Sequence, residues 1–279
     1  MELQKLLNTI RNLVEVDTTV KTQMVQKGNV TLTGISIGNG DICPTLYMEH
    51  YEDLFQEEGY KAVAKEMIKT LKKVEIPDAD VHQFTSWEYA KDNLILCIAP
   101  KGTNDGTITI PYLDLELYFR VNLDNANMAN GIYKVTEKMF TSWNITKEDI
   151  LDAATRTNTY TAKSMRETLK EMIGDMFDDS LEIPPEQDQT VITNEIKTYG
   201  ASALYNKELF KEIADKCESD LYIIPSSIHE LIAISIKNGG SKESMDSMVK
   251  EVNETQVEPE EVLSDHVYIF RRDTMEIEL

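Results

Sequence analysis

Hydrophobic residues recur at helical spacing in several separate stretches of the chain. Over residues 3–14, aliphatic side chains return every three or four positions, which predicts a short amphipathic helix. The same spacing over 51–74, with lysines on the opposite face, predicts a longer helix that ends before Pro77. Ser86 is suited to cap a further helix over 87–98, where the apolar residues continue the helical spacing.

Runs rich in β-branched residues predict strands near the N-terminus. The stretches 14–26 and 30–37 flank Gly28 and Asn29, and this arrangement is typical of a β-hairpin. Residues 43–51 predict a third strand in the same part of the chain. This early order of strands followed by helices favours an antiparallel sheet covered by helices.

The middle of the chain predicts a second hairpin. Leucine or phenylalanine occupies every second position from 113 to 119, which indicates a strand with one buried face. Residues 132–140 are expected to pair with this strand across the polar loop 122–131.

The second half alternates between helical and strand-like stretches. We expect helices that begin after Thr146, at 161–177, after Asn206 and at 241–253, and strands around Gly200 within 190–205 and at 220–227, 231–236 and 266–272. The fold class that these elements predict is α+β, with antiparallel sheets and helices packed on one face.

Pro184 and Pro185 lie in the acidic stretch 178–190, which is the best candidate for a linker. The expected division is an N-terminal α+β region, 1–183, and a C-terminal α+β region, 184–279. These regions are either two sub-domains or parts of one continuous domain.

Composition adds a strong acidic bias to this picture. The 279 residues include 28 basic and 49 acidic side chains, which give a net charge of −21, and the acidic excess is spread along the whole chain. Such a field disfavours direct binding to nucleic acid or to an anionic membrane and favours a basic protein partner. No stretch approaches 18 apolar residues, and no signal peptide is evident, so we expect a cytoplasmic protein.

The chain shows no motif for a metal or a cofactor. Its three cysteines are few and far apart, which disfavours a disulfide framework and a zinc site. The four histidines are isolated from one another, and the glycines lack the order of a phosphate-binding loop. We therefore expect neither a metal nor a cofactor.

Two short polar clusters resemble catalytic groupings. Ser227, His229 and Glu230 offer a hydroxyl, an imidazole and a carboxylate. In an extended strand Ser227 and His229 would stand about 7 Å apart, which is too far for direct proton transfer. The stretch from Ser264 to His266 is similar, and both clusters are better interpreted as turns with hydroxyl caps. No catalytic role is assigned, and the candidates for one are Ser227, His229, Glu230 and His266.

The segments LYIIPSSIHE and EVLSDHVY, together with GNVTLTGISI near the N-terminus, resemble an uncharacterised domain family of Firmicutes, particularly of clostridial gut bacteria. This resemblance covers most of the chain and is weakest over 100–200. It implies a bacterial, cytoplasmic protein, and it carries no established activity.

These observations favour a non-enzymatic acidic protein that engages a basic protein partner, for example an anti-defence protein or DNA mimic from a mobile element. The alternatives are a hydrolase-like enzyme that uses Ser227, His229 and Glu230, and a structural or regulatory module. The acidic residues that we expect at the partner surface are Glu258, Glu260, Glu261, Asp265, Asp178 and Asp179.

Overall fold

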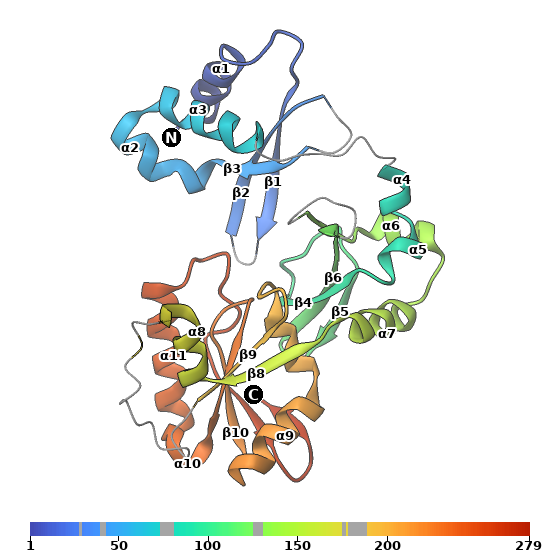
Figure 1. The fold of residues 1–279 in the computed structure, drawn as a ribbon, viewed down its shortest axis with the longest axis vertical. Helices are drawn as coiled ribbons and strands as arrows, with labels where there is room; N and C mark the ends of the chain where they lie inside the picture. Colours follow the sequence, from blue (N-terminus) through green and yellow to red (C-terminus); the bar gives the residue numbers. More distant parts are fainter. Residues whose placement is uncertain (28–29, 40–42, 73–80, 125–130, 175–176, 178–188) are drawn as a thin grey trace.

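The computed structural model describes residues 1–27, 30–39, 43–72, 81–124, 131–174, 177 and 189–279. Within these residues the strands form three antiparallel sheets, and helices pack around them, so the predicted α+β class is confirmed (Figure 1).

The first sheet carries the predicted N-terminal hairpin. Its strands are β1 (Val20–Lys27), β2 (Val30–Ile37) and β3 (Thr45–Tyr47), in the order β1-β2-β3. Lys27 pairs with Val30 at the end of the β1–β2 ladder. Helices α1 (Leu3–Arg11) and α3 (Tyr60–Lys72) cover one face of this sheet, and their apolar residues form a separate small core with Ile35.

The helix predicted over 51–74 is divided into two. The 3-10 turn η1 (Met48–Tyr51) precedes α2 (Glu52–Glu58), and α3 follows after Gly59. Gly59 has a φ of +75°, a conformation that ends a helix and that glycine adopts without steric cost. Pro77 lies outside the described residues.

The second sheet is built from the middle of the chain. Its strands are β4 (Leu94–Pro100), β5 (Thr109–Tyr112), β6 (Leu115–Asn122) and β7 (Ile132–Lys134), with β6 between β4 and β5 and also paired with β7. The predicted helix over 87–98 is wrong, because α5 ends at Ala90 and β4 begins at Leu94. A strand buried on both faces is apolar throughout, and a short apolar run does not distinguish a strand from a helix.

The expectation of one buried face for the strand at 113–119 is also wrong. Residues 115–119 are buried without interruption, so both faces of β6 are covered. Leu113 lies in the preceding turn with a φ of +54°. The second face of β6 carries Glu116, Tyr118 and Arg120, and it points away from the main core.

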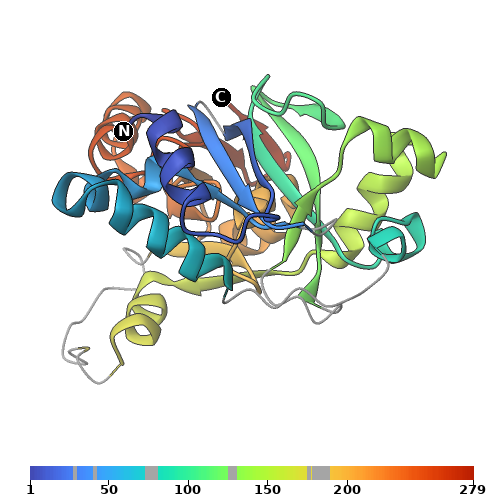
Figure 2. The same cartoon turned by 90° about the horizontal axis from the view of Figure 1, so that it is seen from above.

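Helices flank this second sheet at one end of the molecule. They are α4 (Val81–Phe84), α5 (Trp87–Ala90), α6 (Glu137–Trp143) and α7 (Lys147–Thr157). The predicted helix start after Thr146 is confirmed, and Thr146 forms a capping box with Asp149 there. Figure 2 shows α6 and α7 on the side of the molecule opposite to the N-terminal helices.

The third sheet, in the C-terminal half, has the order β13-β12-β10-β11-β9-β8. Its strands are β8 (Tyr160–Ser164), β9 (Thr190–Asn194), β10 (Leu221–Pro225), β11 (Leu231–Ser235), β12 (Tyr268–Arg271) and β13 (Glu276–Glu278). Its helical segments are α8 (Met165–Ile173), η5 (Gly200–Tyr205), α9 (Lys207–Cys217), α10 (Ile236–Gly239) and α11 (Lys242–Gln256). The predicted helix 161–177 thus begins as a strand, and the strand expected after Gly200 is a 3-10 turn.

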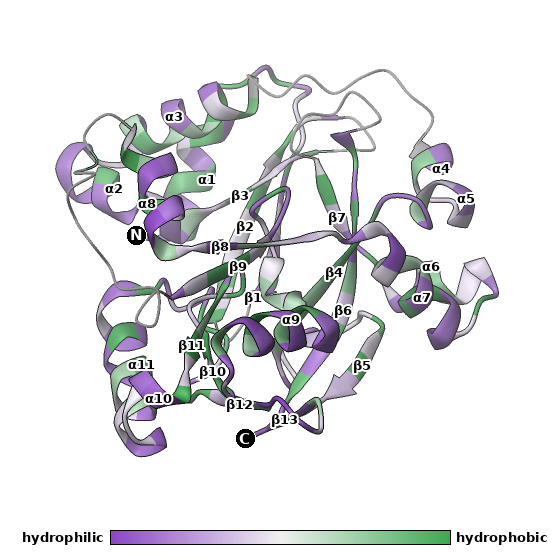
Figure 3. Ribbon diagram, turned by 60° about the horizontal axis from the view of Figure 1, so that its bottom comes forward, coloured by the Kyte–Doolittle hydropathy of each residue, from purple (hydrophilic) through white to green (hydrophobic). Residues whose placement is uncertain are grey.

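Helices cover both faces of the third sheet, whereas the sequence predicted one covered face. Phe210 and Ala214 of α9 pack into the largest core cluster, and Met245 and Val249 of α11 pack on the opposite face. Figure 3 shows the central strands β10 and β11 as largely hydrophobic, and hydrophilic residues predominate in α2 and α8. Both faces of β10 carry apolar, buried side chains, so helices can pack on each side of the sheet.

One hydrophobic cluster joins the second and third sheets. It contains residues from both sides of the proposed boundary at Pro184, for example Phe119 and Phe270. The linker at 178–190 lies almost wholly outside the described residues. The division into 1–183 and 184–279 therefore stays a prediction.

Candidate functional site

A pocket of about 230 Å³ lies where the N-terminal hairpin meets the second sheet and loops of the C-terminal half. Figure 1 shows β1 and β2 pointing from the N-terminal helices towards the rest of the molecule. The residues that line the pocket come from segments far apart in the chain: Gln26, Lys27, Ala99, Asn104, Tyr118, Arg120, Lys134, Tyr199, Ile228, His229, Glu260 and Glu261.

Two basic residues stand directly opposite each other on the floor of this pocket. Arg120 of β6 pairs with Lys134 of β7 in the antiparallel ladder, and paired residues project their side chains from the same face of a sheet. Within the described ranges, no carboxylate lies within 4.0 Å of either basic group. Because like charges at paired positions destabilise a sheet, this arrangement does not serve the stability of the fold.

The Arg120 guanidinium packs against two aromatic rings. Its Cζ lies 4.5 Å from the centroid of the Tyr199 ring and 5.6 Å from that of Tyr118. Such contacts stabilise a cation by about 0.5–2 kcal/mol. The Nε atom is buried and has no hydrogen-bond partner among the described residues. A buried donor without a partner costs about 1–3 kcal/mol, so Arg120 is a candidate member of a binding site.

Lys134 is held by a chain of polar contacts. Its Nζ donates to Oδ1 of Asn104 at 3.0 Å, and Nδ2 of Asn104 donates to the buried carboxylate of Glu116 at 3.1 Å. Burial, followed by the charge of Arg120, lowers the pKa of Lys134 to about 8. The ammonium group is therefore mostly protonated at neutral pH, and it loses its charge in mildly alkaline solution.

Cys97, the only described cysteine near the pocket floor, is unreactive near neutral pH. Cys97 of β4 is fully buried and pairs with Tyr118 of β6. Burial raises the pKa of the Cys97 thiol to about 12, although the charge of Arg120 opposes this effect. Since the thiolate is the nucleophilic form of cysteine, Cys97 is not a nucleophile near neutral pH.

The rim of the pocket joins the N-terminal hairpin to the C-terminal half. Lys27 lies 3.6 Å from Glu260, and His50 contacts the same carboxylate oxygen at 3.0 Å. The Lys27 ammonium also sits 4.0 Å from the centroid of the Tyr47 ring. Burial lowers the pKa of Lys27, and Glu260 opposes this shift.

The second rim contact fixes the tautomer of His229. Its Nδ1 accepts a hydrogen bond from the backbone N–H of Tyr199 at 3.0 Å, so Nδ1 carries no proton. Its Nε2 then donates to Oε1 of Glu261 at 3.2 Å. The imidazole is thus oriented by Tyr199 and Glu261, and neither partner is a hydroxyl nucleophile.

The other members of the predicted Ser-His-Glu cluster have backbone or local partners. The Ser227 hydroxyl accepts a hydrogen bond from the backbone N–H of His229 at 3.0 Å. The Ser226 hydroxyl donates to Oε1 of Glu230 at 3.1 Å. These contacts form the tight loop between β10 and β11, as the interpretation of this stretch as a turn with hydroxyl caps expected.

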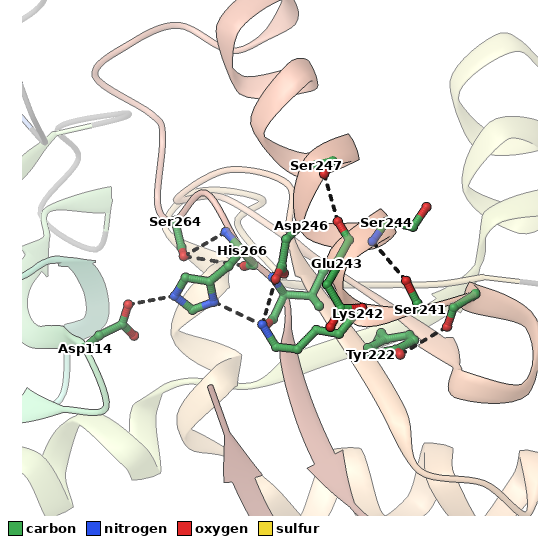
Figure 4. Close-up of polar contacts among 12 residues, drawn as sticks. Asp114, Tyr222, Ser241, Lys242, Glu243, Ser244, Asp246, Ser247, Ser264 and His266 are labelled. Carbon is green, nitrogen blue, oxygen red and sulfur yellow. Dashed lines mark hydrogen bonds and ion pairs between the residues drawn. The ribbon is translucent and has the colours of Figure 1, made fainter.

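His266 belongs to a different cluster, which Figure 4 shows in detail. Its Nε2 lies 2.9 Å from Oδ2 of Asp114, and the hydroxyl of Tyr268 donates to the other oxygen of the same carboxylate. The Ser264 hydroxyl accepts from the backbone N–H of His266 and has no contact with the imidazole in this view (Figure 4). Asp114 lies between β5 and β6, so this cluster ties the second sheet to the third.

The acidic residues predicted for a partner surface fall into three groups. Glu260 and Glu261 are on the pocket rim and contact internal bases. The Asp265 carboxylate accepts from Nδ2 of Asn253, and Glu258 is exposed. Asp178 and Asp179 lie outside the described residues. Their role in partner binding stays a prediction.

A larger hollow of about 680 Å³ lies over the third sheet between α8 and α9. It is lined by small strand residues such as Ala162 and Ala233, and the Nζ of Lys237 at its edge donates to the backbone carbonyl of Glu218. All buried side-chain polar atoms around it have partners among the described residues. We therefore regard the smaller, charged pocket as the candidate site.

The described residues provide neither a metal-binding cluster nor a membrane-spanning helix. No group of three or more histidine, cysteine, aspartate or glutamate side chains is placed to hold a metal ion. None of the described helices combines the length and the apolar character needed to cross a bilayer.

Arg120, Lys134 and Tyr199 were missed by sequence reasoning. The hairpin of the second sheet was predicted, and its polar positions include Arg120 and Lys134. The pairing register of the two strands could not be predicted across the long loop. This register is what places Arg120 opposite Lys134. Nothing in the sequence near Tyr199 indicates that its ring packs against Arg120.

The described residues define an α+β protein with three antiparallel sheets and a charged pocket between them, which bases, aromatic rings and two glutamates line. The sequence model of a family of unknown function, DUF5688, matches residues 3–272, and the chain belongs to this family. Neither the curated proteins nor the solved structures include a significant match to the chain.

Proposed function

We propose that this protein is a binding protein for a small anionic ligand, which it holds in the pocket of Arg120 and Lys134. The observation that carries this proposal is the cross-strand pairing of two bases that have no carboxylate partner among the described residues. An anion between them would replace repulsion by attraction. Hydrogen bonds to charged groups contribute about 1.5–3 kcal/mol each, so two such bases can provide useful affinity.

Binding, as opposed to covalent catalysis, is supported by the groups around the pocket. Burial keeps the Cys97 thiol protonated. The Ser227 hydroxyl is occupied by the backbone of His229. Arginine and lysine are the usual residues for recognition of phosphate and carboxylate groups.

Calorimetric titration with inorganic phosphate tests this proposal. The wild-type protein is expected to bind phosphate, and Arg120→Gln and Lys134→Gln are each expected to weaken binding at least tenfold. Arg156→Gln is the matched control, because Arg156 is exposed on α7 and distant in sequence from the pocket. Circular dichroism verifies that each variant is folded. Failure of the folded wild-type protein to bind at about 10 mM phosphate would refute the proposal.

A second candidate function concerns the outer surface. The net charge of −21 supports association with a basic protein partner, and mimicry of DNA on behalf of a mobile element is one form of this proposal. A bacterial cytoplasm is the compartment that we propose, in keeping with three free cysteines. Association with DNA-binding proteins should weaken steeply with salt, and association that is indifferent to salt would contradict this candidate.

A further inference from the structure

We infer that the ligand is a phosphate monoester that carries hydroxyl groups, such as a sugar phosphate. This inference rests on the proposed function, because it names the ligand class for the same pocket. It follows from three properties of the site, namely the charge of its floor, the already paired carboxylates of its rim and the occupied faces of its aromatic rings.

The floor of the pocket matches a dianion. Arg120 and Lys134 supply two positive charges, and no described carboxylate lies within 4.0 Å of either group, since Glu116 reaches Lys134 only through Asn104. A phosphate monoester carries about −1.5 to −2 charges at pH 7 and offers three strong acceptor oxygens. A single carboxylate carries one charge and two oxygens, so it would satisfy only half of this floor.

The rim matches neutral hydrogen-bond donors. Glu260 is already paired with Lys27 and His50, and Glu261 is already paired with His229. A second anionic group on the ligand would meet these carboxylates and be repelled. An amine would compete with bases that already occupy them. Hydroxyl groups can donate to the carboxylate oxygens without either penalty.

A cation already lies against each aromatic ring near the pocket, which limits stacking by a nucleobase. Lys27 covers the ring of Tyr47, and Arg120 lies against the rings of Tyr118 and Tyr199. The volume of about 230 Å³ is also below the range of about 300–1,000 Å³ that is typical of sites for larger ligands. A phosphate with a short polyol fits these limits, and a nucleotide does not.

Titration with a series of probes tests the ligand class. Ribose 5-phosphate is expected to bind at least tenfold more tightly than inorganic phosphate, because its hydroxyls reach the rim. Ribose alone should not bind, and adenosine 5′-monophosphate should bind more weakly than ribose 5-phosphate. In Glu261→Leu, which lacks one of the two rim carboxylates, the advantage of ribose 5-phosphate over phosphate should shrink. The matched control Glu258→Leu should retain it.

The outcomes separate this inference from the proposed function. If phosphate binds and ribose 5-phosphate binds no more tightly, the ligand class is wrong and the proposed function stands. If phosphoethanolamine, which carries an amine in place of hydroxyl groups, binds more tightly than ribose 5-phosphate, the rim recognises amines and the inference is overturned. If no probe binds to the folded protein, the proposed function itself fails.

Discussion

Two residues of the pocket, Arg120 and Lys134, make unfavourable contributions to the stability of the fold. Arg120 and Lys134 repel each other across neighbouring strands, and Nε of Arg120 lacks a partner among the described residues. Either feature destabilises the folded state by an amount comparable to an ordinary hydrogen bond. Functional sites are the usual place for such departures from local stability.

Removal of one charge from the floor should therefore stabilise the protein without ligand. In Lys134→Gln the amide can still donate to Asn104, and the repulsion by Arg120 is lost. We expect the free energy of unfolding to rise by roughly 0.5 kcal/mol while phosphate binding weakens. Chemical denaturation measures this change, and Lys138→Gln, at an exposed lysine of α6, is the control. A decrease in stability equal to that of an ordinary lost contact would contradict the expectation.

The pH dependence of anion binding should follow Lys134. Its pKa of about 8 is set by burial and by Arg120, and Cys97, Glu116 and Lys27 make smaller contributions. As the pH rises through 8, the ammonium group loses its proton and the affinity for sulfate should fall. Sulfate is the suitable probe because its charge is constant in this range. The sign is opposite for the empty protein, which gains stability between pH 8 and 10.5, since the unfolded chain then binds more protons.

At the level of elements, the 3-10 turn η5 holds the loop that carries His229. The backbone N–H of Ala201 donates to the carbonyl of Ile228, and the Thr193 hydroxyl donates to the carbonyl of His229. A Cβ atom on Gly200 would stand 2.6 Å from that same carbonyl and from the backbone nitrogen of Asn194. These contacts are too short, so space requires a glycine at this position.

Gly200→Ala should therefore displace the His229 loop. Overpacking of this kind costs about 1–3 kcal/mol, and a shift of the loop should also weaken binding of ribose 5-phosphate more than that of inorganic phosphate. Thermal denaturation and calorimetry measure the two effects. Normal stability together with normal binding would show that the loop accommodates the extra methyl group.

Most helices and strands of the C-terminal half could be predicted, because their caps and periodicities agree. Asn206 caps α9, and β10, β11 and β12 lie where the apolar runs placed them. Errors occurred where local pattern was uninformative. Leu94–Pro100 is apolar on both faces, so its period was hidden, and β13 has only three residues.

The site was less predictable than the fold, for a physical reason. Its parts come from the hairpin end at Lys27, three strands of the second sheet and loops near Tyr199 and Glu260. Only the packing of three sheets brings these segments together, and no local pattern reports that packing. Glu260 was chosen for its charge, and the structure places it on the pocket rim with internal partners.

The whole molecule combines a negative exterior with a positive interior pocket. A net charge of −21 repels polyanions such as DNA at long range, and the local field of Arg120 and Lys134 acts on a ligand that has entered the pocket. Under the proposed function, size and charge together would select a small anion. Lys27 and His50 both contact Glu260. Among the described rim residues, these ion pairs alone link the N-terminal part of the chain to the C-terminal half.

Glu260→Gln should separate two properties of this junction. Without the carboxylate, Lys27 adds its charge to the pocket, so phosphate should bind several-fold more tightly. The contacts to Lys27 and His50 are weakened, so the free energy of unfolding should fall by about 1 kcal/mol. The protein should therefore unfold at a lower denaturant concentration. Glu258→Gln is the control, because that side chain is exposed. Weaker binding of phosphate would contradict this account of the rim.

The burial of Cys97 makes its thiol a probe for the transient opening of the protein. Its thiol lies beneath the floor of the pocket with none of its surface exposed, whereas Cys43 and Cys217 are half-buried. An alkylating reagent can reach Cys97 only during moments when β4 and β6 separate or the chain unfolds. The labelling rate of this thiol therefore reports how often the structure around it opens. A ligand that bridges Arg120 and Lys134 would lower this rate.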